Sequence, residues 1–94
     1  MVVAVCVIRL NLYGVQSLKE KRQIVKSILA RLSRQFNVAV AEVGYQDIWQ
    51  TTELAAVTVG NDSGHLHARL EKVVAFIEQQ RPDVPIDDYF IEFL

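Results

Sequence analysis

The segment that follows the initial methionine restricts the fold of this chain more than any other. Residues 2–13, VVAVCVIRLNLY, are rich in β-branched side chains, which favour an extended strand. Alternate positions point to opposite faces of a strand, and here one face is apolar throughout while the other is apolar until Arg9 and Asn11. A strand that is apolar on both faces is typical of the centre of a sheet. The segment therefore predicts a sheet whose first strand is central.

Two later segments have the period of amphipathic helices. The first, residues 17–36, begins with Ser17 and Glu20, which match a capping box in which each side chain accepts a free backbone N–H of the first turn. Its apolar positions on one arc are Leu18, Val25, Ile28, Leu29, Leu32 and Phe36, with Ile24 at the edge. Asn37 tolerates left-handed backbone geometry and is expected to end this helix. Residues 65–80 repeat the pattern, with Leu66, Leu70, Val73 and Ile77 on the apolar side.

Three further segments, residues 38–45, 54–60 and 86–94, have the composition of strands. The order is then strand, helix, strand, strand, helix, strand. Right-handed crossovers place both helices on one face of a four-stranded antiparallel sheet. The sequence therefore predicts a single α+β domain over residues 1–94, a ferredoxin-like βαββαβ sandwich with strand order 4-1-3-2. In this order the first and third strands, which are apolar on both faces, lie in the centre.

Positive charge is concentrated in the first part of the chain. Residues 1–37 contain seven Lys or Arg and one acid, whereas residues 38–94 contain three Lys or Arg and ten acids. The net charge of −1 indicates neither a nucleic-acid binder nor a membrane binder by itself. The unequal distribution indicates an interaction surface on the basic part.

Three of these basic residues form a row on the first helix. Lys19, Arg22 and Lys26 are spaced so that they lie along one flank of the apolar stripe. Together with Lys21 and Arg9 they are candidates for contacts with the phosphates of RNA, which would weaken steeply with salt. The alternative is that these long side chains only cover the rim of the core and keep their charges in water.

Three phrases of the sequence resemble a known family. They are S-L-K-E-K-R at residues 17–22, F-N-V-A-V-A-E-V at residues 36–43 and D-I-W-Q at residues 47–50. In this order they resemble the bacterial YlxP-like family, a domain-of-unknown-function family. The resemblance implies a ferredoxin-like fold, a cytoplasmic setting and a gene often found near genes for translation and ribosome maturation. It implies no established activity and no catalytic residues.

A tryptophan lies in the segment between the second and third strands. Trp49, with Asp47 and Gln50 beside it, is a candidate partner contact, because an exposed indole can stack on a base or anchor a protein. The alternative is that Trp49 folds back over an open end of the core, since burial of an indole removes much apolar area from water.

One face of the predicted sheet has no helix over it. The alternate set Val3, Val5, Val7, Phe90 and Leu94 is expected to lie there. A monomer seldom leaves an apolar patch of this kind in water, so the sequence predicts a homodimer through the open face or a strand added at an edge.

No catalytic, metal or cofactor site is predicted. His65 and His67 are two positions apart and do not face each other on a helix, and the single Cys6 adds no plausible zinc ligand set. Asp87 and Asp88 are adjacent and would point to opposite faces of a strand, which makes a poor acid/base pair.

The start of the chain does not resemble a signal or a membrane span. Residues 1–8 are apolar but lack a charged leading region and are far shorter than the roughly 20 residues that cross a bilayer. A lone cysteine cannot form an intramolecular disulfide, which favours the cytoplasm.

The function that these observations favour is a non-enzymatic binding module that contacts RNA or a ribosomal particle through the basic row. The alternative is a regulatory module that dimerises through its sheet and binds a protein or a small ligand.

Overall fold

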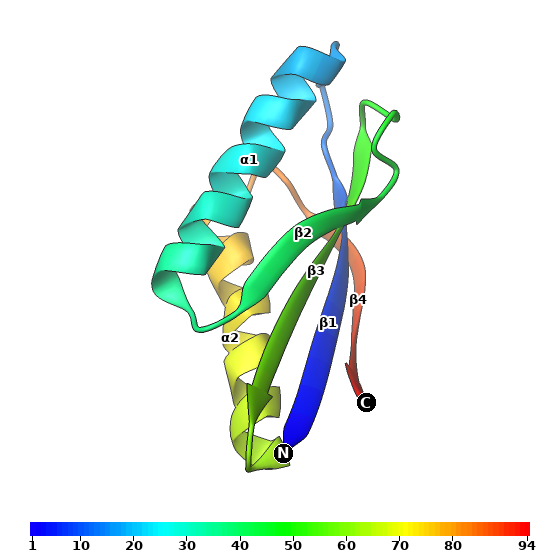
Figure 1. Ribbon diagram of the computed structural model, residues 1–94. Helices are drawn as coiled ribbons and strands as arrows, with labels where there is room; N and C mark the ends of the chain where they lie inside the picture. Colours follow the sequence, from blue (N-terminus) through cyan, green and yellow to red (C-terminus); the bar gives the residue numbers. More distant parts are fainter.

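The computed structural model describes all of residues 1–94, and it has the predicted order of elements (Figure 1). The elements are β1 (Val2–Asn11), α1 (Leu18–Gln35), β2 (Ala39–Gly44), β3 (Thr51–Gly60), α2 (Ser63–Gln80) and β4 (Ile86–Phe93). The four strands form one antiparallel sheet in the order β2-β3-β1-β4, which is the predicted order counted from the other edge. The ferredoxin-like fold is therefore confirmed.

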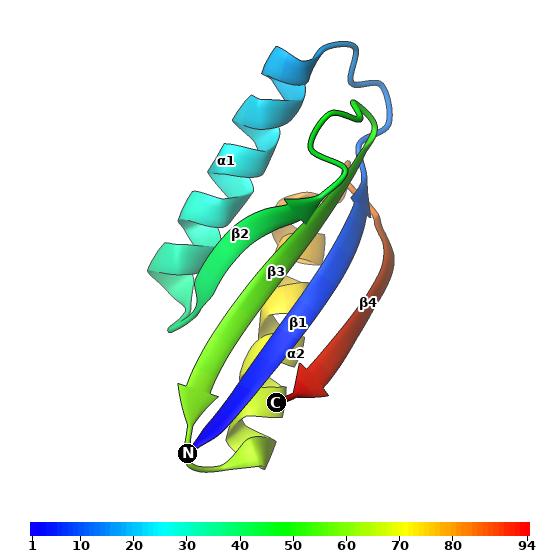
Figure 2. The same cartoon turned by 45° about the vertical axis from the view of Figure 1, so that its right-hand side comes forward.

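The central place of β1 follows from its two apolar faces. It pairs with β3 along its whole length and with β4 on its other side (Figure 2). Ala4, Cys6, Ile8 and Leu10 have no exposed surface, while the residues between them are half-buried. Alternation of this kind means that one side of the strand is covered by helices and the other side is open.

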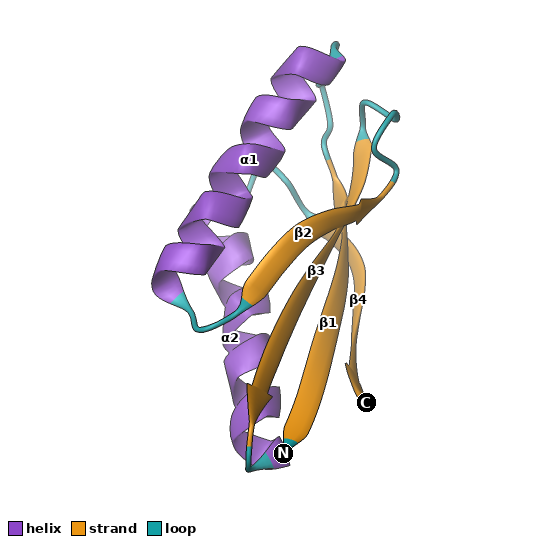
Figure 3. Ribbon diagram, viewed as in Figure 1, coloured by secondary structure: helices purple, strands orange, loops and turns teal.

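Both helices lie on the same side of the sheet (Figure 3). Helix α2 packs over β1, β3 and β4, and α1 packs mainly against the edge strand β2. The aromatic rings of Phe36 and Phe76 meet edge to face, with centroids 5.5 Å apart, and this contact joins the two helices. The core between the layers contains 17 buried apolar residues, and no buried side-chain polar atom lacks a hydrogen bond.

The opposite side of the sheet is the open face, which no helix covers (Figure 3). The pairing places Val7 beside Phe90, and the N–H of Leu94 donates to the carbonyl of Val3, so the predicted set shares this face. The prediction of an uncovered apolar face is thus confirmed.

The helix ends differ in part from the predictions. The Ser17 hydroxyl accepts the N–H of Glu20 at 3.1 Å, but the Glu20 carboxylate accepts the N–H of Gln16 and not that of Ser17. Helix α1 ends at Gln35 with an extended residue, Phe36, as its cap. Asn37 is not left-handed, so the prediction for it is wrong.

Asp62 caps α2 by accepting the N–H of His65 at 3.1 Å. This hydrogen bond to the ionised carboxylate lowers the pKa of Asp62 below its usual value. Neither helix is long and apolar enough to cross a membrane.

Candidate functional site

The outer side of α1 is strongly basic. Its exposed cations, called the basic face below, are Lys19, Arg22, Lys26, Arg31 and Arg34. The predicted row of Lys19, Arg22 and Lys26 is exposed. Arg34 and Arg31 are also exposed but lie further around the helix, and the guanidinium of Arg31 donates to the side-chain oxygen of Gln80 on α2 at 3.5 Å. None of the five lies within ion-pair distance of a carboxylate. The exposed surface of α1 therefore carries five cations and one acid, Glu20.

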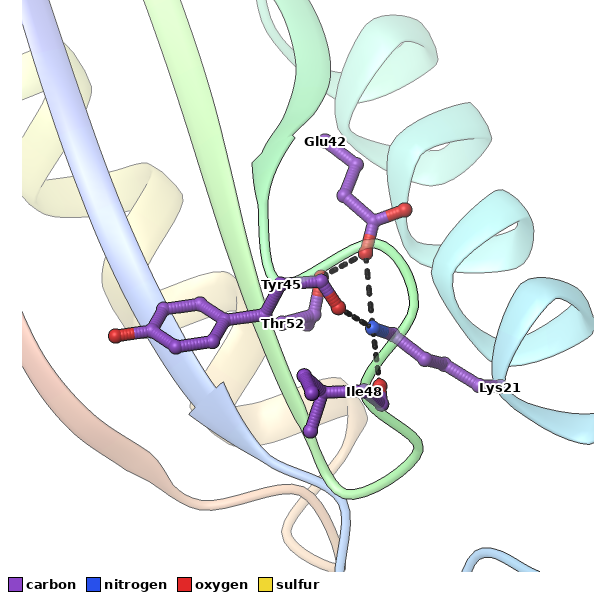
Figure 4. Close-up of polar contacts among 5 residues, drawn as sticks. All are labelled: Lys21, Glu42, Tyr45, Ile48 and Thr52. Atoms are coloured by element: carbon purple, nitrogen blue, oxygen red, sulfur yellow. Dashed lines mark hydrogen bonds and ion pairs between the residues drawn. The ribbon is translucent and has the colours of Figure 1, made fainter. Parts of the chain in front are cut away.

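Lys21 does not belong to the basic face, contrary to the prediction. Its side chain is only 1% exposed and points under the loop between β2 and β3 (Figure 4). The ammonium donates to the carbonyl of Tyr45 and, at 2.5 Å, to that of Ile48. It also lies 3.3 Å from Oε2 of Glu42. Two of its three N–H donors therefore have carbonyl acceptors, and the carboxylate of Glu42 balances the buried charge.

Glu42 completes the Lys21 site. Its carboxylate oxygen Oε2 accepts the hydroxyl of the buried Thr52 at 2.5 Å, while it pairs with Lys21 (Figure 4). Tyr45 has φ of 60°, a left-handed geometry that is uncommon for a residue other than glycine. Because the Lys21 ammonium binds the Tyr45 carbonyl, the helix stabilises the strained turn directly.

Gln50 connects the same loop to the end of β1. Its carbonyl accepts the N–H of Leu12 at 2.9 Å, and its side-chain amide donates to the carbonyl of Val15 at 3.4 Å. Gln50 therefore has a structural role in its own chain, besides being predicted as a partner contact. The three phrases that resemble the YlxP-like family meet at this place through Lys21, Glu42 and the loop that ends at Gln50.

Trp49 and Asp47 lie exposed on the loop that these contacts stabilise. The indole side chain is 48% exposed, so it covers the core at most in part. Ile48, Tyr45 and Tyr13 are exposed to a similar or greater extent. The start of α1 and this loop lie at the same end of the molecule, away from both chain termini (Figure 1). Aromatic and basic side chains are thus available at one end.

Arg9 lies on the open face, with the sheet between it and α1. Its neighbours across the strands are Glu53 on β3 and Asp88 on β4. It therefore does not extend the basic face, although the sequence correctly predicted a polar position there.

A groove of about 480 Å³ runs between α1 and β2. Val25, Leu29 and Val40 form its apolar floor, and Arg22 and Lys26 stand at its border. The groove is continuous with the basic face, so a partner bound along α1 would also meet apolar surface.

Residues with metal-binding or nucleophilic side chains are scattered. No three His, Cys, Asp or Glu side chains are close enough to hold one ion. His65 and His67 are exposed, and His67 is 3.8 Å from Glu71. Burial raises the pKa of the Cys6 thiol to about 11, so this thiol is neutral near pH 7.

The comparison with protein families agrees with the resemblance that the three phrases indicate. Residues 3–89 match the family described as "Protein of unknown function (DUF503)". The chain belongs to this family. A relative, "Uncharacterized protein YlxP" of Bacillus subtilis (strain 168), is 42% identical over 67 residues, which are 71% of this chain and 73% of that protein. The family match includes every residue of the Lys21 site and the whole of α1.

Two solved structures resemble this DUF503 chain in fold. The de novo designed protein Foldit4 has a TM-score of 0.55 and 14% identity, with 100% of this chain and 97% of that chain covered. A mutant of SnoaB, a cofactor-independent oxygenase from Streptomyces nogalater, has a TM-score of 0.53 and 14% identity, with 98% of this chain and 90% of that chain covered. At this identity the likeness extends to the fold alone.

Proposed function

We propose that this protein is a non-enzymatic binding module that contacts structured RNA or a ribosomal particle through the basic face of α1. The observation that supports the proposal most is the exposure of five cations on one helix, none of them paired with a carboxylate. Phosphate groups would supply the missing negative charge, and release of their counterions would drive binding.

Stability of the helix accounts for only part of this charge: Arg34, in the last turn, interacts favourably with the helix dipole, whereas Lys19 does not. Lys19 stands in the first turn, where a cation opposes the helix dipole at a cost of a few tenths of a kcal/mol. Glu20, the single acid of α1, is engaged with the N–H of Gln16. The position of Lys19, which costs some helix stability, is consistent with selection for a contact outside the chain.

The test is binding to ribosomal subunits and to a structured RNA across a salt series. A variant with Lys19, Arg22 and Lys26 each replaced by Glu should bind at least about a hundredfold more weakly at low salt. Its logarithmic salt slope should fall by about 3, because each lost phosphate contact lowers the slope by about 1.

A control variant makes the other helix more acidic. Lys72, Ala75 and Gln79 are exposed on α2, and their replacement by Glu should leave binding within about threefold of the parent. If the α1 variant bound as well as the parent, or if the parent did not bind at low salt, the proposed surface would be wrong.

Trp49 gives a second, independent measurement. It is the only tryptophan, and if it stacks on an unpaired base its fluorescence should be quenched on binding. Trp49→Ala should weaken binding about tenfold without changing the salt slope, because stacking involves no phosphate. Unchanged affinity and unchanged fluorescence would remove Trp49 from the interface.

A further inference from the structure

The open face is an apolar surface that no helix covers. Its apolar members are Val3, Val5 and Val7 of β1, Ala55, Val57 and Val59 of β3, Ala39 and Ala41 of β2, Phe90 of β4, and Leu94. Val59, Phe90 and Leu94 are 53%, 50% and 78% exposed. Apolar surface of this extent in water indicates an interface.

The size of the face is suited to a dimer. Four strands of 10, 6, 10 and 8 residues, about 4.8 Å apart and rising about 3.3 Å per residue, cover roughly 540 Å² before the relief of the side chains is counted. A stable protein interface buries about 800 Å² on each partner. The open face alone therefore approaches the area that a specific association needs.

The pattern of residues on the face is complementary to itself. One row across the sheet is Ala41, Ala55, Val7 and Phe90, from the β2 edge to the β4 edge, so side chains grow larger along the row. The row nearer the loop end has Glu53, Arg9 and Asp88 in the same direction. A twofold axis that lies between two stacked sheets and runs parallel to the strands places each row over the same row of the second copy, in reversed order. The small end of a row then lies over the large end of its copy.

We propose that two copies of this chain pack face to face about a twofold axis that runs parallel to the strands, between β1 and β3. In this arrangement β1 lies over the partner's β3, and β4 lies over the partner's β2. Phe90 then faces the small side chain of the partner's Ala41. Arg9 faces the partner's Glu53, and by symmetry Glu53 faces the partner's Arg9, so size and charge match together.

An axis perpendicular to the strands fits less well. It would place β4 over the partner's β4, and this edge strand has three acids, Asp87, Asp88 and Glu92. Of these, Asp88 and Glu92 are on the open face, where the reversed overlap of the two β4 strands would bring each of them near the acids of the partner's β4. Repulsion between like charges disfavours that arrangement. The basic face of α1 lies on the far side of the sheet, so the proposed dimer is independent of RNA binding.

The first test is the mass in solution, measured by sedimentation equilibrium from micromolar to millimolar concentration. The parent should approach twice the chain mass of 10.7 kDa. Val57→Glu should remain monomeric, because it places a carboxylate at the centre of the interface. Lys26→Glu on the basic face is the control and should dimerise like the parent. Circular dichroism verifies that each variant is folded.

The second test identifies the axis. Arg9→Glu and Glu53→Arg should each weaken the dimer about tenfold, because each creates like charges across the interface. An equimolar mixture of the two variants should regain the parent's affinity, since each altered residue then faces its opposite. The repulsion that each variant has within its own chain persists in the mixture, so recovery reports the contact between chains.

Three results would overturn the proposal. They are a parent that stays monomeric at every concentration, a Val57→Glu variant that still dimerises, and a mixture that does not recover. A monomeric parent would mean that the open face binds a different protein. A dimeric Val57→Glu variant would require another interface, and a mixture that does not recover would require another axis.

Discussion

Replacement of Lys21 by methionine is expected to lower the free energy of unfolding by about 3 kcal/mol, as measured by urea denaturation. Methionine fills similar space but provides no donor. The carbonyls of Tyr45 and Ile48 would lose their partner, and Glu42 would keep a partly buried charge without its cation. Removal of one member of a buried ion pair is costly because the other member remains out of water.

The matched control is Lys26→Met on the same helix. Lys26 is exposed and has no ion-pair partner, so its replacement should change stability by less than about 0.5 kcal/mol. Adding Glu42→Gln to Lys21→Met should recover part of the loss, because the unpaired carboxylate is then neutral. If Lys21→Met cost no more than Lys26→Met, the buried contacts would not contribute to stability.

Leu70→Ala is expected to lower the free energy of unfolding by about 3 kcal/mol, within the usual range for a leucine deleted from a core. Leu70 has no exposed surface and belongs to α2, the helix that covers the centre of the sheet. The loss has two parts, the transfer of the removed carbon atoms and the cavity that remains.

The neighbouring Lys72→Ala is the control for Leu70→Ala. Lys72 is exposed on the same helix and makes no ion pair, so its loss should be within about 0.5 kcal/mol of zero. Equal effects of the two substitutions in thermal and urea unfolding would contradict the described packing of α2.

The fold could be predicted because the residue pattern of each segment agrees with its place in the sheet or over it. The two apolar faces of residues 2–11 required neighbours on both sides, and the structure provides β3 and β4. The helical period of residues 18–35 required a surface to pack against, which the sheet provides. The start of β3 was predicted too late, because Thr51, Thr52 and Glu53 are polar and lack the apolar pattern of the rest of that strand.

The site could be predicted only in part, and Lys21 is the reason. A lysine is almost always exposed, so its charge pointed to the surface. Its position indicated burial instead, because Lys21 is four residues before Val25 and seven before Ile28, the spacing of the buried stripe. Glu42 is the one acid among the apolar positions of β2. The two together were a signal for a buried pair, but only the fold brings them within 3.3 Å.

Arg9 illustrates a different limit. The polar face at its position was correctly recognised, yet its charge was grouped with that of α1. Strand and helix positions can be compared only when it is known which face of the sheet meets the helices. The alternation gives two equivalent choices, and the pairing of Arg9 with Glu53 and Asp88 on the uncovered side decides between them.

The contacts of Lys21 with the loop are made to main-chain carbonyls, and this affects how the loop can change. Every residue type has a carbonyl, so the shape of the turn does not depend on the side chains of Tyr45 and Ile48. Helix α1 fixes the backbone, and the exposed side chains from residue 45 to residue 49 remain free to differ between related proteins. Binding preferences could therefore diverge in evolution, or be exchanged by engineering, while the loop retains one conformation.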